Sequence, residues 1–265
     1  MVTTKTAALI ALIAAFYASS LQAVVIVTHG FHANHETWFK PGGDFFKALK
    51  TAAKAQGHSV ISYSWNQKRA LGLSQQEHEL AGNQLAQIIT MFCASYRYNP
   101  EFANNHEIII VSHSMGGRVG KYCIAALERN SKLIKKNERW FNLISRLRGF
   151  IRSYLYYTAK PFISTFIMLA TPHGENDPSL NPDIVGAVYN LYSPADIVVP
   201  LVGTYLLPHE THTCHPHAHD VELSHVTPLG HIDMHSPVIA PHLFEIARTM
   251  KPETKYTTYA VPAAQ

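Results

Sequence analysis

The sequence predicts an α/β fold in which helices flank a mostly parallel β-sheet. Two continuous apolar runs, at residues 24–27 and 108–111, are typical of strands that are buried on both faces, as in parallel sheets. The second run passes through a turn of small residues directly into a helical stretch at residues 118–129. The chain has 265 residues, 47% of them apolar, which suits one such domain with a full core.

The other expected elements alternate between strands and helices along the chain. Phe45, Phe46 and Leu49, for example, recur at helical spacing until Gly57 ends the pattern. Strands are expected at 60–65, 164–170, 185–192 and 221–226, and helices at 44–56, 75–96 and 238–250. Residues 24–250 are therefore predicted to form one domain, followed by a loose tail at residues 251–265.

Residues 1–23 resemble a secretory signal peptide. A positive charge at Lys5 precedes an apolar core at residues 7–18, and small residues follow that could precede a cleavage site. The apolar core is shorter than the roughly 20 residues that a membrane-spanning helix needs. We therefore expect a secreted or periplasmic protein, with an uncleaved anchor or a buried first helix as the alternatives.

The net charge of +4 is concentrated in one segment. Between residues 131 and 160, eight lysines and arginines accompany a single glutamate, so this segment alone carries +7. Such a local charge does not indicate a nucleic-acid-binding surface, and no nucleic-acid partner is expected. Three cysteines without a C-x-x-C pair give no disulfide framework, and the sequence does not indicate an oligomeric state.

The turn after the second apolar run has the sequence Ser-His-Ser-Met-Gly-Gly, residues 112–117. A strand, a sharp turn with a serine and a helix form the context of a nucleophile elbow, in which the turn exposes the serine hydroxyl. Gly116 provides the space that this turn needs, whereas Ser112 stands where a glycine is usual. Ser114 is therefore the candidate nucleophile, and an ordinary strand-to-helix turn that contains serines is the alternative.

With this elbow, the sequence resembles the lipase/esterase branch of the α/β-hydrolase superfamily. The first apolar run ends in Thr-His-Gly-Phe, residues 28–31, which is similar to the His-Gly-X loop of that family. The resemblance implies an α/β-hydrolase fold. Family members often have two strands before this loop, but the signal-like segment takes their place here, so we expect a minimal sheet of about six strands. The resemblance also assigns the oxyanion hole to the backbone N–H groups of Phe31 and Met115. A plain strand end with a glycine turn is the alternative for residues 28–31.

The resemblance also assigns the two partners of the nucleophile. The phrase Ser-x-x-Asp-x-x-Val-Pro at residues 193–200 matches the setting of the family's catalytic acid, which implies Asp196 in that role. The phrase Gly-His-x-Asp-Met at residues 230–234 matches the setting of the catalytic histidine, which implies His231. His225 is the alternative base, although it lies inside an expected strand. The chain order of serine, aspartate and histidine is that of the α/β-hydrolases.

A substrate cleft is expected around these residues. In the family, an Ala-Thr-Pro-His phrase such as the one that ends at residue 173 helps to line the cleft. Serine-based acyl transfer needs neither a metal nor an organic cofactor, so none is assigned. The residues that the resemblance assigns to substrate binding are His29, Gly30, His113, Pro172 and His173.

Residues 131–160 occupy the place where the lipase branch carries lids and caps, so the resemblance implies a helical lid or cap insertion there. Within residues 133–157, apolar side chains recur at helical spacing and basic residues fill other positions. Such a basic amphipathic helix can also lie on an anionic membrane, and peripheral membrane contact is the second expectation. A surface helix that packs on the sheet with a solvated basic face is the alternative.

Residues 209–219 are rich in histidine and proline and include Cys214. Imidazole and thiolate groups bind zinc and copper, but the spacing here matches no standard ligand set. A solvated loop is therefore favoured, and no metal site is assigned.

Three functions compete for this sequence. The first is a secreted or membrane-associated serine esterase or lipase, which cleaves a small-molecule or lipid ester through an acyl-enzyme. The second is another acyl-transfer enzyme on the same scaffold, such as a thioesterase, amidase or acyltransferase, because fold and triad do not fix the leaving group. The third is a non-catalytic metal- or lipid-binding protein that uses the histidine-rich segment and the basic helix. The ordered series of motifs favours the first.

Overall fold

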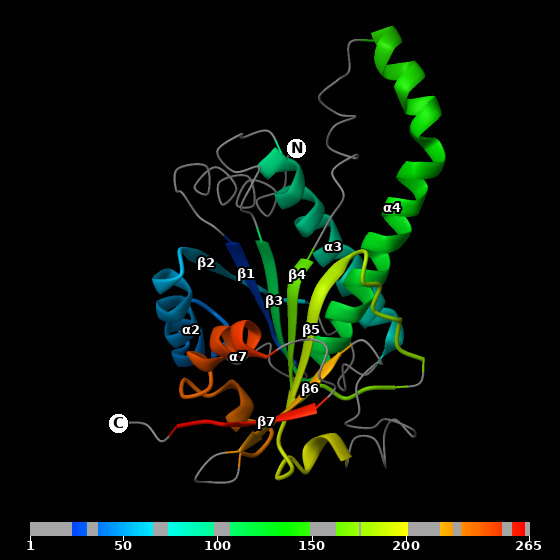
Figure 1. The fold of residues 1–265 in the computed structure, drawn as a ribbon. Helices are drawn as coiled ribbons and strands as arrows, with labels where there is room; N and C mark the ends of the chain where they lie inside the picture. Colours follow the sequence, from blue (N-terminus) through cyan, green and yellow to red (C-terminus); the bar gives the residue numbers. More distant parts are fainter. Residues whose placement is uncertain are drawn as a thin grey trace.

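Seven parallel strands form one sheet, in the order β2-β1-β3-β4-β5-β6-β7, in the computed structural model (Figure 1). The strands are β1 (Ala23–Thr28), β2 (His58–Tyr63), β3 (Glu107–His113), β4 (Ile163–Leu169), β5 (Val185–Tyr192), β6 (His219–Ser224) and β7 (Tyr256–Ala260). The structure describes residues 23–30, 37–65, 74–97, 107–148, 163–174, 176–200, 218–224, 229–250 and 256–262. The predicted α/β class is confirmed, and each expected strand lies within two residues of its predicted bounds.

Helices cover both faces of the sheet, so the hydrophobic core consists of two layers, one on each face of the sheet. The described helices are α2 (Asp44–Ala55), α3 (Gln75–Arg97), α4 (Met115–Arg148), α7 (His242–Thr249) and the 3₁₀ helix η1 (Asp233–His235). In β1, Val25 and Val27 pack in the same layer as α2 and α7. Val24 and Ile26 point the other way, into the layer of α3 and α4. The run 24–27 is apolar at every position because alternate side chains enter different buried layers.

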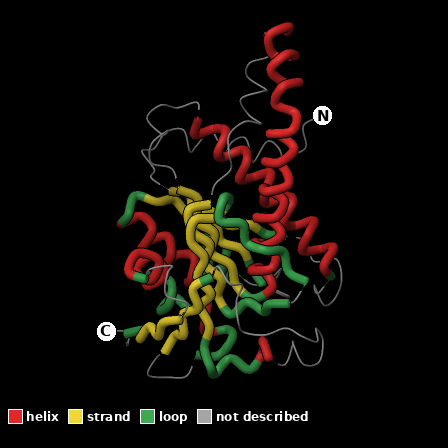
Figure 2. Tube along the Cα trace, turned by 45° about the vertical axis from the view of Figure 1, so that its right-hand side comes forward, coloured by secondary structure: helices red, strands yellow, loops and turns green. Residues whose placement is uncertain are grey.

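Helix α4 is one continuous element, whereas the sequence predicted a short elbow helix followed by a separate lid or cap insertion at 131–160. No glycine or proline interrupts residues 121–148, so the helix continues to Arg148. Its 34 residues span about 51 Å, against about 23 Å for the seven residues of β3. Because α4 begins at the carboxyl end of β3 and runs back along the sheet, its last turns project beyond the strands (Figures 1 and 2).

This projection concerns the described part of the predicted lid or cap insertion. Residues 131–148 form the part of α4 that is distant from Ser114, so they do not cover the nucleophile in this structure. The rest of the predicted insertion, residues 149–160, lies outside the described residues, as do residues 1–22. None of the described helices is both long enough and apolar enough to cross a membrane.

The end of the chain corrects a second prediction, because residues 256–260 form strand β7 and not part of a loose tail. This strand adds a seventh member to the sheet and pairs with β6 in parallel register, with Val221 opposite Thr257. The segment Tyr-Thr-Thr-Tyr-Ala is rich in residues that favour strands, although the charged residues before it gave a polar appearance to the tail. Val261 then becomes buried and donates its backbone N–H to the carbonyl of Ser224 at 2.7 Å.

Candidate active site

The turn between β3 and α4 holds Ser114 in a left-handed backbone conformation, with a φ of 52°. A non-glycine residue rarely adopts this conformation unless its surroundings enforce it. The Ser114 N–H donates to the carbonyl of Leu169 at 2.8 Å, which ties the turn to the end of β4. On the other side Gly30 approaches so closely that a Cβ there would lie 2.7 Å from the Cβ of Ser114. Neighbouring backbone therefore fixes the strained serine from two directions.

The same turn explains why Ser112 replaces the usual glycine of the motif. Its side chain is fully buried, and its hydroxyl donates to the carbonyl of Ile167 at 3.2 Å on the neighbouring strand. Gly116 has no room for a side chain, because a Cβ there would overlap the backbone oxygen of His29. The geometry of a nucleophile elbow thus forms despite the altered first position.

The structure brings Asp196 and His231 together across 35 residues of sequence. The His231 Nδ1–H donates to Oδ2 of Asp196 at 2.8 Å. The other carboxylate oxygen accepts the backbone N–H groups of Val198 at 2.9 Å and Val199 at 3.3 Å. Burial opposes ionisation of Asp196, but the histidine and these two amides outweigh it and hold the pKa of the carboxyl below its ordinary value. The carboxylate can therefore stay charged and orient one tautomer of His231.

His113 links this pair to the elbow. Its Nε2–H donates to the backbone carbonyl of His231 at 3.0 Å, and the centroids of the two rings lie 4.7 Å apart. The ring of His235 lies 4.6 Å from His113 and stacks on Trp38 at 4.3 Å. Because His113 is the residue before Ser114, the segment that carries His231 lies beside the candidate nucleophile.

Two histidines that the sequence assigned to substrate binding are buried, and the first of them is His29. Its side chain is fully buried and its ring stacks on Trp65 at 5.3 Å. Its Nε2 accepts the backbone N–H of Trp65 at 3.2 Å, and its carbonyl accepts the indole N–H at 2.9 Å. His29 therefore supports the loop after β2 and leaves no face for a substrate. Phe31, the predicted oxyanion donor next to this loop, lies outside the described residues.

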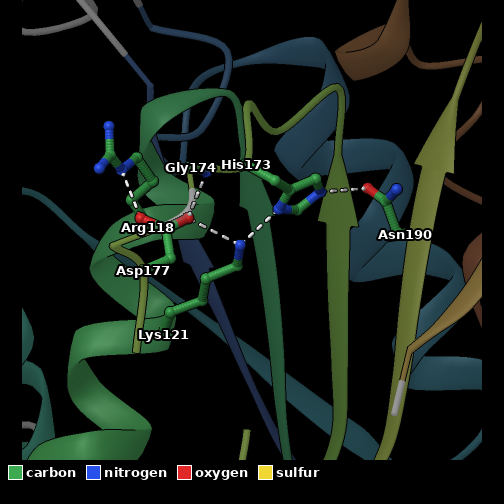
Figure 3. Close-up of polar contacts among 6 residues, drawn as sticks. All are labelled: Arg118, Lys121, His173, Gly174, Asp177 and Asn190. Atoms are coloured by element: carbon green, nitrogen blue, oxygen red, sulfur yellow. Dashed lines mark hydrogen bonds and ion pairs between the residues drawn. The ribbon is translucent and has the colours of Figure 1, made fainter. Parts of the chain in front are cut away.

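The second is His173, which lies in a buried polar network together with residues of α4 and β5 (Figure 3). Lys121 donates to Nδ1 of His173, and the His173 Nε2–H donates to Oδ1 of Asn190 at 3.1 Å. Lys121 also pairs with Asp177 at 2.9 Å, as does Arg118 through its Nε at 2.9 Å. Since both His173 and the preceding Pro172 are buried, this part of the predicted cleft lining belongs to the framework.

The network also removes His173 from consideration as a catalytic base. Burial, and then the positive charge of Lys121, lower the pKa of His173 to about 3. Burial opposes the charge on Asp177, but the adjacent cations prevail and its pKa lies below the ordinary value. No sequence motif identified Asp177 or Asn190, because their partners Lys121 and His173 lie 56 and 17 residues away in sequence.

No cluster of three or more potential metal-binding side chains occurs among the residues that the structure describes. Most of the histidine-rich segment, residues 209–217, lies outside that part of the chain, as does the alternative base His225. His219, the last histidine of the segment, belongs to β6 and contacts the hydroxyl of Thr257 at 3.0 Å.

Comparison with known proteins gave one family and several similar folds. The model of the family described as "Putative serine esterase (DUF676)" matches residues 19–174. A "putative hydrolase of the alpha/beta superfamily" from Xanthomonas campestris pv. campestris is 12% identical, with 86% of this chain and 99% of that chain covered and a TM-score of 0.45. A second "putative alpha/beta hydrolase", from Agrobacterium tumefaciens, is 12% identical, with 87% and 85% covered and a TM-score of 0.45.

A further similar structure comes from a description of LipS and LipT, two metagenome-derived lipolytic enzymes. It is 11% identical, with 87% of this chain and 95% of that chain covered and a TM-score of 0.40. No match was found among curated proteins.

Proposed function

Because the chain belongs to the DUF676 serine esterase family, within the α/β-hydrolase superfamily, we propose that it hydrolyses carboxylic esters through Ser114, His231 and Asp196. The observation that carries this proposal is the 2.8 Å hydrogen bond between Asp196 and His231, at the edge of the sheet that presents Ser114. A serine hydroxyl needs an adjacent base to become a nucleophile, and the base needs a third group to fix its tautomer. In this proposal Ser114 is the nucleophile, His231 is the base, and Asp196 fixes the tautomer of His231.

Catalysis begins when His231 accepts the hydroxyl proton of Ser114 as Oγ attacks the ester carbonyl carbon. The imidazolium that forms is stabilised by the carboxylate of Asp196, which stays ionised. When the tetrahedral intermediate collapses, the bond to the leaving oxygen breaks and His231 returns the proton to the alcohol. Water then attacks the acyl-enzyme while His231 accepts a proton from it. When the second tetrahedral intermediate collapses, the bond to Oγ of Ser114 breaks, His231 returns the proton to Oγ, and the carboxylic acid is released.

The negative oxygen of the tetrahedral intermediate requires hydrogen-bond donors. Met115 is the first residue of α4, and the first N–H groups of a helix have no partner within the helix. The positive end of the helix dipole lies at the same place. We assign the backbone N–H of Met115 as one donor and that of Phe31 as the other, each contributing roughly 3–4 kcal/mol to transition-state stabilisation.

An apolar rim defined by Ile197, Val198 and Ile232 supports an ester with an apolar acyl group. Their exposed fractions are 68%, 37% and 71%, respectively. Two of them directly follow Asp196 and the third directly follows His231, so exposed aliphatic side chains adjoin the proposed acid and base in sequence. Burial of a methylene group against such surface contributes about 0.8 kcal/mol, which favours longer acyl chains over acetate.

We also propose that the protein is exported and acts at a membrane surface. The signal-like composition of residues 1–23 supports export to a secreted or periplasmic location. The basic amphipathic pattern of residues 133–157 supports peripheral contact with an anionic membrane. In this arrangement α4 reaches the lipid surface through the end of the helix that is distant from the nucleophile.

Hydrolysis of p-nitrophenyl esters from acetate to palmitate tests the proposal, with Ser114→Ala as the decisive variant. We expect Ser114→Ala to lower kcat by at least about 1,000-fold, because removal of the nucleophile ends covalent catalysis. Ser112→Ala is the matched control, since that serine lies two residues away with its side chain buried, and its kcat is expected to stay within about fivefold of the wild type.

The acyl-chain profile and the leaving group complete the experiment. Preference for longer chains supports a lipid-like ester, whereas activity on short chains alone indicates an esterase of small molecules. Hydrolysis of matched thioesters and amides is measured in parallel, and a preference for either over the esters would indicate a thioesterase or an amidase. Equal activities of the wild type and Ser114→Ala on every substrate would overturn the proposal.

A further inference from the structure

His113 is a buried titratable residue that the proposed reaction does not use, although it precedes Ser114 in the chain. Its ring lies among three other rings: His231 at 4.7 Å, His235 at 4.6 Å and Trp38 at 5.5 Å. On its other side Gly30 leaves little space, because a Cβ there would lie 3.3 Å from Nδ1 of His113. The ring is therefore closely packed in the orientation observed.

That orientation has a defined proton arrangement. A carbonyl oxygen only accepts hydrogen bonds, so the 3.0 Å contact with the His231 carbonyl requires a proton on Nε2 of His113. Burial, and then the neighbouring His231 and His235, hold the pKa of His113 well below its ordinary value. The neutral ring thus donates through Nε2 and adds no positive charge beside the imidazolium that forms on His231.

The bond supplies a constraint that the Asp196 contact lacks. Asp196 binds the side chain of His231 and fixes the direction of its Nδ1–H. It does not by itself fix the distance from the histidine to the elbow, because Asp196 belongs to the segment after β5. His113 lies at the end of β3, one residue before the candidate nucleophile, and donates a hydrogen bond to the backbone carbonyl of the same histidine.

We propose that His113 is a positioning residue whose Nε2–H···O=C bond sets the distance between Ser114 and His231. This assignment rests on the proposed function, because it concerns the geometry of that nucleophile and base. Reacting groups that shift by 1 Å can lose about 100-fold in rate, so a single bond between their two segments has a large effect. The assignment replaces the substrate-binding role that the sequence suggested for His113.

The test compares two substitutions that differ in one hydrogen bond. His113→Gln keeps an amide N–H near the position of Nε2, and we expect its kcat to stay within about fivefold of the wild type. His113→Leu keeps the approximate volume but no donor, and we expect kcat to fall roughly 10- to 100-fold with KM within about twofold. If His113→Leu does not fold, His113→Asn replaces it, because the shorter amide does not reach the carbonyl.

His219→Leu is the matched control, because His219 is also buried and bonded through Nε2 but lies in β6. We expect His219→Leu to lower the melting temperature. Its kcat should stay unchanged when it is calculated per active site, with the active sites counted by titration with a phosphonate that reacts with the nucleophilic serine. A wild-type kcat in His113→Leu, or equal losses in His113→Leu and His113→Gln, would overturn the assignment.

A readout without turnover separates this assignment from the proposed function. We expect the proton between His231 Nδ1 and Asp196 to give a low-field resonance in proton NMR spectra, which changes when the imidazole ring shifts relative to the carboxylate. We expect this resonance to be retained in His113→Gln and shifted or broadened in His113→Leu. If the wild type hydrolyses no ester, the proposed function fails, and the resonance alone decides whether His113 holds His231 in place. An identical resonance in both variants would refute the positioning role.

Discussion

His173 shows how the surroundings of one residue link protonation to folding. Burial and the charge of Lys121 lower its pKa from 6.5 to about 3 in the folded chain. Between these two values the unfolded chain binds the extra proton and the folded chain does not. The free energy of unfolding therefore falls as the pH drops below 6.5, by about 1.4 kcal/mol per pH unit, until the folded group also titrates near pH 3. Above pH 6.5 the full stability is present.

Substitution of His173 by Asn tests this linkage, because an amide oxygen can still accept from Lys121 but does not titrate. Between pH 7 and pH 5 we expect the variant to lose about 2 kcal/mol less stability than the wild type. Urea unfolding at the two pH values, followed by circular dichroism, measures the difference. A loss of equal size in both proteins would show that His173 binds a proton in the folded state.

Helix α4 carries the prediction that belongs to the scale of elements. Residues 132–148 contain six basic residues and one glutamate, on a helix whose far end projects from the sheet (Figure 2). Each basic residue near an anionic lipid surface contributes about 1 kcal/mol to binding. We therefore expect the triple change Lys135→Gln, Arg139→Gln and Arg146→Gln to weaken binding to phosphatidylserine vesicles roughly 100-fold in sedimentation assays.

The matched control for α4 is a triple neutralisation on α2, at Lys47, Lys50 and Lys54, which removes the same charge from another helix. Vesicle binding should persist in this control at low ionic strength and decrease with added salt. If both triple variants bind equally well, the projecting part of α4 is not the membrane contact.

Elements and short motifs were predictable from sequence to different degrees, and the reason is the range of the interactions involved. Asp196 and His231 lie in local phrases that determine their turns, and the structure brings them together as the motif order implies. The link from Lys121 to Asn190 through His173 leaves no local pattern, because it joins a helix, a loop and a strand. His29 showed that a motif identifies a loop but does not reveal which of its side chains is buried.

At the scale of the whole molecule, the sheet positions the three distant segments of the proposed site. Ser114 follows β3, Asp196 follows β5, and His231 lies between β6 and α7. In parallel strands the carboxyl ends meet at one edge, so the order β3-β4-β5-β6 places these segments side by side. The stability of the outer strands therefore supports the segment that carries the base.

Strand β7 protects that outer part of the sheet, and its removal gives the last prediction. The hydroxyl of Tyr259 donates to Glu245 at 2.7 Å and contacts His242 at 3.0 Å, which ties β7 to α7. A chain that ends at Met250 loses this tie, the buried side chain of Val261 and the pairing with β6. We expect it to melt about 10 °C lower, which corresponds to roughly 3 kcal/mol.

The same truncation should also promote association, because it leaves β6 as an unpaired edge that can add strands from other molecules. Thermal melts followed by circular dichroism and by light scattering measure both effects. The matched control ends at Pro262, which keeps β7 and removes only the last three residues. Since the control retains every described contact of β7, equal melting temperatures for the two truncated chains would mean that the seventh strand does not stabilise the sheet that carries the site.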